Sequence, residues 1–141
     1  MILMLRWTVL RSKNLNYLID TQILIWHING ANELPKKIKM ILDDRKNNFY
    51  ISVASIWEIV IKLNYGKLEL NCSFDELYEI LETYIYEILP INEEHLKSYL
   101  TLPIIHKDPF DRMLISTSLA ENLQLITSDE EIHKYKVNWV W

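Results

Sequence analysis

Four acidic residues of this chain stand where carboxylates from distant segments could act together. Asp20 and Asp129 each follow a short apolar run that is typical of a strand. Glu58 and Asp111 each stand near the start of a predicted helix. In an open α/β sheet, the carboxyl ends of the strands and the adjacent helix starts lie at one edge, where ligands bind. The four side chains are therefore expected to meet in one cleft.

A cluster of converging carboxylates predicts a bound divalent cation. Two carboxylates about 4 Å apart repel each other by roughly 4 kcal/mol at an effective dielectric constant of about 20. Such a cluster must protonate, move apart or hold a cation, and the helix starts beside Glu58 and Asp111 favour the ionised form. Carboxylate oxygens select Mg²⁺, or Mn²⁺ in its place. A bound ion of this kind activates water and neutralises charge on a phosphate, so the matching reaction is phosphodiester hydrolysis.

Structural roles are an alternative for most of these acids taken one at a time. Glu58 lies three residues after Ser55 and could complete a capping box with it at a helix start. Asp111 lies three residues after Asp108, on the same helix face, and has no such structural role. The other acids could fill a turn or an N-cap position, as Asp often does: Asp20, Asp108 and Asp129.

Charged and aromatic neighbours of the acids have mainly structural interpretations. Lys62 lies four residues after Glu58, a helical spacing that favours an ion pair over a phosphate contact. The same spacing separates Arg112 from Asp108 and supports the same expectation. Three tryptophans fall in apolar segments and are expected in the core: Trp26, Trp57 and Trp139.

Some neighbours could serve a functional site. His106 precedes Asp108 by two residues and could contact a substrate. Four hydroxyl-bearing residues adjoin the acids and could support them by hydrogen bonds, as groups around metal ligands do: Thr21, Ser55, Thr127 and Ser128. The four histidines are scattered along the sequence and Cys72 is the only cysteine, so no zinc-site spacing is present.

The composition fits one globular domain. The chain has 141 residues, of which 50% are hydrophobic and 24% charged, and domains commonly have about 100–150 residues. Residues 1–15 precede the first strand pattern and are interpreted as an extension, which assigns the domain to residues 16–141. The net charge of −4 is not the basic balance typical of nucleic-acid-binding proteins. One cysteine and the lack of an apolar run of about 20 residues predict a soluble, cytoplasmic protein without a membrane span.

Apolar periodicity and turn residues predict alternating strands and helices. The expected strands are residues 17–19, 49–51, 87–89, 124–127 and 137–141. The expected helices are residues 21–28, 34–46, 55–65, 73–84, 92–100 and 108–122, with a short helix after residue 129. Strands separated by helices form right-handed βαβ units, which place helices on both faces of a mainly parallel sheet. The predicted fold is of the α/β class, a three-layer α/β/α sandwich.

Four segments together resemble PIN domains of the VapC toxin type. The segments are residues 17–26, residues 51–59 with Lys62 and residues 66–68, residues 106–115, and residues 125–129, in the family's order and at ordinary spacing. The resemblance implies a PIN-like fold and a Mg²⁺-dependent ribonuclease, the toxin of a type II toxin–antitoxin system. It also implies a cognate antitoxin protein as partner and a homodimer of the toxin.

The resemblance also assigns roles to individual acids. Asp20, Glu58 and Asp111 match the metal-binding core of the family, and Asp129 matches its fourth acid. Asp108 is typical of the subgroup, either as an additional ligand or as an N-cap. Leu15 stands where the family often has its initiator Met, so we hypothesise that residues 1–15 reflect a misassigned start codon.

The sequence therefore predicts an endoribonuclease that cleaves RNA with a metal-activated water. In this prediction Asp20 and Asp111 hold the ion, while Glu58 orients the water or shares in ligation. A catalytically silent PIN-like module that binds protein partners is the alternative, although such a module has no need of mutually repelling acids. A phosphotransfer domain of the receiver or haloacid-dehalogenase type requires an acidic pair after the first strand, which residues 20–22 do not supply.

Overall fold

Five short strands form the central sheet, in the order β3-β2-β1-β4-β5. The computed structural model describes residues 15–84 and 86–141. The strands are β1 (Asn16–Ile19), β2 (Asn48–Ser52), β3 (Tyr86–Leu89), β4 (Gln124–Ile126) and β5 (Trp139–Val140). Because every neighbouring pair is parallel, the carboxyl ends of all these strands lie at the same edge of the sheet.

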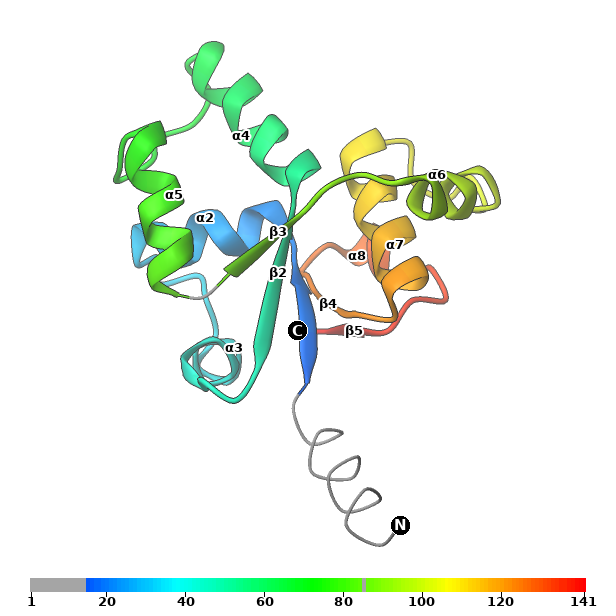
Figure 1. The fold of residues 1–141 in the computed structure, drawn as a ribbon, viewed down its shortest axis with the longest axis horizontal. Coiled ribbons are helices and arrows are strands. Elements are labelled where there is room, and N and C mark those ends of the chain that lie inside the picture. Colours follow the sequence, from blue (N-terminus) through cyan, green and yellow to red (C-terminus); the bar gives the residue numbers. More distant parts are fainter. Residues whose placement is uncertain (1–14, 85) are drawn as a thin grey trace, which may run out of the picture.

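Helices cover both faces of this sheet. They are α2 (Thr21–Asn29), α3 (Lys36–Asp43), α4 (Val53–Asn64), α5 (Phe74–Thr83), α6 (Glu93–Leu100), α7 (Pro109–Glu121) and α8 (Glu130–His133). Figure 1 shows α2 to α5 on one side of the sheet and α6 to α8 on the other. The predicted three-layer α/β/α sandwich is confirmed, with a sheet that is parallel throughout.

Side-chain alternation along β1 divides the core between the two faces of the sheet. Tyr17 and Ile19 pack into one apolar cluster with residues of α2 to α5. Leu18, which lies between them, packs into a second cluster with Leu114 and Ile115 of α7. Strands that are covered on both faces are typical of parallel sheets. Burial on both sides fixes β1 at the centre of the molecule and so fixes the position of the acid that follows it.

The helix that carries Glu58 begins earlier than the sequence predicts. Ser52, at the end of β2, is the N-cap of α4, and its Oγ accepts a hydrogen bond from the Ala54 N–H at 3.1 Å. The predicted capping box of Ser55 with Glu58 is therefore wrong. Ser55 is instead buried within the first turns of the helix, which leaves the Glu58 carboxylate to other partners.

Other boundaries differ by a few residues from the prediction. Helix α3 ends at Asp43 and not near residue 46, and the last strand begins at Trp139 and not at residue 137. The predicted extension of residues 1–15 lies outside the described residues except for Leu15. In the described part of the chain, no helix combines the length and the apolar composition that a bilayer crossing requires.

Candidate functional site

A polar cleft of about 380 Å³ lies at the carboxyl edge of the sheet. All five acids that the sequence singles out line it, together with Thr21, Lys62 and other polar residues: Asp20, Glu58, Asp108, Asp111 and Asp129. They come from the loop after β1, from α4, from the first turn of α7 and from the loop after β4. The structure thus brings together side chains that are far apart in the sequence.

Asp20 is the most deeply buried acid of the cleft, with 5% of its surface exposed. Its N–H donates a hydrogen bond to the Ile126 carbonyl at 3.0 Å, which fixes it between the ends of β1 and β4. The Thr127 hydroxyl donates to Asp20 Oδ2 at 2.7 Å. Burial raises the pKa of Asp20 to about 6, the Thr127 hydrogen bond opposes this rise, and the charges of Glu58 and Asp129 add to it.

Asp108 and Asp111 occupy the start of α7 and have different roles there. Asp108 is the N-cap, because its Oδ1 accepts hydrogen bonds from the N–H groups of Phe110 and Asp111 at 2.9 and 3.0 Å. Asp111 has no capping role, and its carboxylate faces the cleft. Burial raises the pKa of Asp111 to about 7, with further increases from the charges of Asp20 and Asp108. Burial is the main cause of the raised pKa of both carboxyls, and the charges of the neighbouring carboxylates add to it.

Glu58 contributes a carboxylate that is only partly satisfied. Its Oε2 forms the predicted ion pair with Lys62 at 3.3 Å. Its Oε1 is buried and has no hydrogen-bond partner among the described residues. Buried polar atoms nearly always have a partner, and one without a partner is costly. A cation beside Oε1 would supply the missing interaction, so the residues present fit a divalent metal.

Hydroxyl groups connect the segments that carry the acids. Thr127 is fully buried, and its Oγ1 accepts a hydrogen bond from the Asp129 N–H at 3.1 Å while donating to Asp20. Thr21 Oγ1 donates to Ser55 Oγ at 2.9 Å, which joins the first turns of α2 and α4. The supporting role that the sequence suggests for the hydroxyls is therefore visible at Thr127, whereas the hydroxyls of Thr21 and Ser55 bond to each other.

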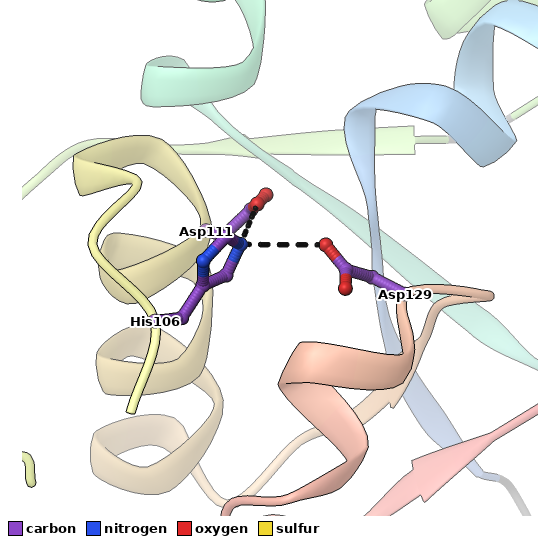
Figure 2. Close-up of side chains that lie close together, drawn as sticks. All are labelled: His106, Asp111 and Asp129. Atoms are coloured by element: carbon purple, nitrogen blue, oxygen red, sulfur yellow. Dashed lines mark hydrogen bonds and ion pairs between the residues drawn. The ribbon is translucent and has the colours of Figure 1, made fainter. Parts of the chain in front are cut away.

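His106 is the site residue whose role the sequence leaves open. Its Nε2 lies 2.8 Å from Asp111 Oδ2 and 3.5 Å from Asp129 Oδ2, as Figure 2 shows. Burial lowers the pKa of His106, but the hydrogen bond with Asp111 and the charges of three aspartates outweigh burial, so that the pKa is raised overall. The only sequence signal for this contact is the position of His106 just before a capped helix start, where a side chain can fold back over the first turn.

The sequence expectations for Arg112 and Trp57 are wrong. Arg112 makes no ion pair with Asp108; the residue is 8% exposed, and its guanidinium donates to the Pro103 carbonyl and the Tyr135 hydroxyl at 2.9 and 3.1 Å. Trp57 is 60% exposed and lies edge-on to Phe110, with ring centroids 5.2 Å apart. The apolar residues around Trp57 predict a position in the core, but its side chain lies on the exposed face of α4.

Of the other two tryptophans, Trp26 packs at the edge of the core and Trp139 is 39% exposed. Trp139 stacks on the ring of His133 with centroids 3.5 Å apart. The expectation of a core position therefore fails for Trp139 as well, because the last strand lies at the edge of the sheet.

The arrangement can hold a cation with carboxylate oxygens and one imidazole. The Nε2 of His106 and one carboxylate oxygen each from Asp111 and Asp129 lie within 4.8 Å of one another. Glu58 and Asp20 add two more carboxylates to the same cleft. Without a cation, the acidic cleft repels phosphate groups. A divalent ion bound among these side chains would place positive charge at its mouth.

Comparisons with known proteins identify the family and the fold. The family model described as PIN domain matches residues 17–138. A toxin–antitoxin complex from Klebsiella pneumoniae is similar in structure, with a TM-score of 0.64 at 21% identity over 89% of this chain and 96% of that chain. VapBC2 from Rickettsia felis, bound to a DNA fragment from its promoter, has a TM-score of 0.63 at 16% identity over 89% of this chain and 98% of that chain.

FitAcB from Neisseria gonorrhoeae is similar to the same degree, with a TM-score of 0.63 at 19% identity over 89% of this chain and 96% of that chain. At such low identities these similarities establish the fold. Among curated proteins, none matches the chain.

Proposed function

The chain belongs to the PIN domain family, and we propose that it is a divalent-metal-dependent endoribonuclease, the toxin of a type II toxin–antitoxin pair. One observation carries the proposal: Asp20, Glu58 and Asp111 converge in one cleft, partly or wholly buried. Crowded, buried carboxylates destabilise a fold unless a cation compensates them. The presence of these three acids in one cleft is therefore best explained by a reaction that uses a bound cation.

In the proposed reaction, each acid has a role that follows from its position. Mg²⁺, or Mn²⁺ in its place, would supply a water of lowered pKa and positive charge beside the scissile phosphate. Asp20 and Asp111 would hold the ion, and Asp129 would complete the negative field around it. Glu58, with one oxygen on Lys62 and the other without a partner among the described residues, would orient the attacking water or share in ligation.

The partners of this nuclease are part of the proposal. The similar structures from Klebsiella pneumoniae and Rickettsia felis are a toxin–antitoxin complex and a VapBC assembly, which supports a cognate antitoxin for this chain. RNA is the proposed substrate, a homodimer is the proposed assembly, and the cytoplasm is the proposed site of action. We assign the activity to residues 16–141 and treat residues 1–15 as an extension.

A catalytically silent protein-interaction module is the second candidate, and one observation favours it. An apolar groove of about 470 Å³ lies beside the acidic cleft and is lined by Trp57, Leu96, Phe110 and other apolar side chains. Exposed apolar surface of this kind often marks a protein contact. The groove is compatible with both candidates, because a toxin also binds a protein, its antitoxin. Variants of the acids are therefore needed to distinguish the two candidates.

The decisive experiment replaces one carboxylate at a time by an amide of the same shape. Purified Asp20→Asn and Asp111→Asn proteins are expected to lose RNA cleavage in Mg²⁺ by a factor of about 100 or more, because several kcal/mol of transition-state stabilisation depend on the ion. Both should also fail to arrest growth when expressed without an antitoxin. Cleavage is measured on total RNA by sequencing of 5′ ends, with EDTA as the metal-free reference.

The matched control is Asp43→Asn, which makes the same change at an exposed acid of α3 outside the cleft. It is expected to retain full cleavage. Full activity in either site variant would refute the assignment of the acids. Growth arrest by the wild-type chain without new RNA ends would favour the protein-interaction module.

A further inference from the structure

Three ligand atoms from three separate segments meet at one point of the cleft. His106 Nε2 lies 2.8 Å from Asp111 Oδ2 and 3.5 Å from Asp129 Oδ2. Figure 2 shows the imidazole between the two carboxylates, with one on the first turn of α7 and the other on the loop before α8. Ligands bound to one transition-metal ion at about 2.1 Å lie about 3.0–3.4 Å apart in octahedral or tetrahedral geometry. The two distances from His106 Nε2 lie near this range, and all three ligand atoms lie within 4.8 Å of one another.

A hydrogen bond alone accounts for only half of this arrangement. The Nε2 atom carries at most one proton, and Asp111 Oδ2 at 2.8 Å is placed to accept it. Asp129 Oδ2 faces the same nitrogen at 3.5 Å, where it gains only an ion pair with a protonated imidazole, and its partner Oδ1 accepts from the Glu131 N–H. A cation that replaces the proton can bind all three groups at once.

The position of His106 is built into the fold and does not depend on the ion. The Tyr135 hydroxyl accepts hydrogen bonds from the N–H groups of Ile105 and His106 at 3.2 and 2.9 Å and donates one to the Pro103 carbonyl at 2.9 Å. The buried Arg112 guanidinium donates to the same carbonyl and to the same hydroxyl. These bonds fix the backbone on the amino side of His106, and Arg112 also donates to the His106 carbonyl at 3.3 Å, so the fold itself holds the backbone of His106 at the cleft.

We propose that His106 is a nitrogen ligand of the cation, together with Asp111 and Asp129, and that the site therefore prefers Mn²⁺ to Mg²⁺ more strongly than carboxylates alone would. Mg²⁺ is a hard ion that binds through oxygens and keeps several of its waters, whereas Mn²⁺, which also binds carboxylates, is the first ion of the divalent transition series whose affinity for nitrogen and oxygen ligands increases along the series. The inference takes the cleft as the metal site of the proposed function and adds a ligand and a selectivity to it. Oxygen ligation by Asp20 and Glu58 can continue alongside, because divalent ions of this kind accept about six ligands.

Nitrogen ligation has a direct spectroscopic readout. The full chain with Mn²⁺ is expected to show electron spin echo modulation from a directly bound imidazole ¹⁴N, and histidine labelled with ¹⁵N should change that modulation. The signal should disappear in His106→Asn and persist in His133→Asn, the matched control. His133 lies near the cleft but bonds the main-chain carbonyl of Thr127 through its Nε2 at 2.8 Å. Comparison of the labelled with the unlabelled wild-type protein tests nitrogen ligation even if a variant does not fold.

Calorimetric titrations test the selectivity. His106→Asn is expected to weaken Mn²⁺ binding by at least about tenfold, in the range seen when groups around metal ligands are lost, and to weaken Mg²⁺ binding much less. Mn²⁺ that binds and supports RNA cleavage without any histidine modulation would overturn this inference and leave the proposed function standing. Absence of Mn²⁺ and Mg²⁺ binding together with absence of cleavage would overturn both.

Discussion

Two clefts of nearly equal volume lie at opposite edges of the sheet, and only one of them concentrates buried charge. The cleft at the carboxyl edge measures about 380 Å³ and contains Asp20, which is 5% exposed. The cleft at the amino edge measures about 390 Å³ and includes Asp43 and Asp44, which are exposed and adjacent in sequence. Volume therefore does not distinguish the two clefts. The burial of acids from distant segments does.

The direction of the helices explains the difference between the two edges. Helices α2, α4, α7 and α8 begin at the carboxyl edge, and their N-termini carry partial positive charge that favours carboxylates. At the amino edge, α3 and α5 end, and the partial charge of a helix C-terminus is negative. The acids at that edge remain in solvent, where Asp44 Oδ1 accepts a hydrogen bond from the Lys46 N–H. A parallel sheet thus gives its two edges different electrostatics.

The largest effect is expected for Asp20→Asn in metal-free protein. The pKa of Asp20 is about 6 in the folded chain against an ordinary value of 3.8 for an aspartate in the unfolded chain, so the folded chain binds more protons than the unfolded chain between these pH values. Stability in EDTA should therefore fall as pH rises from about 4 to 6. The amide cannot ionise, so at pH 7 the variant should be more stable than wild type by about 3 kcal/mol. Urea unfolding at pH 4 and pH 7 measures this, and an equal difference at both pH values would contradict it.

A slightly smaller effect is expected when a divalent ion is added. At a concentration of about 100 times its Kd, Mn²⁺ should stabilise the wild-type protein by about 2.7 kcal/mol, because it binds the folded state only. Asp20→Asn should lose most of this gain, whereas Asp43→Asn at the other edge should keep it. Thermal unfolding with and without the ion gives the comparison. A similar ion-dependent gain in both variants would show that the two edges do not differ in the way we describe.

Tyr135→Phe should have a moderate effect at the carboxyl edge. It removes the hydroxyl that accepts from the N–H groups of Ile105 and His106, and it is expected to cost about 1–2 kcal/mol of stability. Mn²⁺ affinity should fall with it, because the loop no longer holds the imidazole in place. Tyr84→Phe, at the amino-edge cleft, is the control and should leave Mn²⁺ affinity unchanged. A stability loss without any change in Mn²⁺ affinity would limit Tyr135 to a structural role.

The smallest effect is expected for Asp44→Ala at the amino edge. The residue is exposed, and within the described residues its side chain accepts only the local hydrogen bond from the Lys46 N–H, so the free energy of unfolding should change by about 0.5 kcal/mol or less. The change should be the same with and without Mn²⁺. A difference in stability that depends on the ion would reveal metal binding at the amino edge and break the contrast between the two clefts.

The features that depend on near neighbours in the chain are those that the sequence predicts well. Asp108 followed by Pro109 predicts the start of α7, and the structure has Asp108 as its N-cap. The alternation of buried side chains along β1 likewise follows from three consecutive apolar residues. Caps and strand faces are decided within a few residues, so the types and order of the elements can be read before the fold is known.

The errors fall where burial depends on distant partners. Trp57 and Ile56 are adjacent in α4, yet one is 60% exposed and the other is 4% exposed, because one residue turns a helix by about 100°. An apolar segment does not say which of the two faces the sheet. Arg112 is buried against Pro103 and Tyr135, and Tyr135 is 23 residues away. The spacing of Arg112 from Asp108 in the sequence gives no indication of either contact.

The sequence by itself determined the α/β class, the order of strands and helices, and the acids that end or begin them. The tertiary structure alone decided which groups face each other: Thr127 with Asp20, 107 residues apart, and His106 between Asp111 and Asp129. The reason is one of scale. Helices, caps and strands arise from interactions over a few residues, whereas a ligand set requires side chains from separate segments to be placed to within a fraction of an ångström, which only the packing of the whole sheet and its helices achieves.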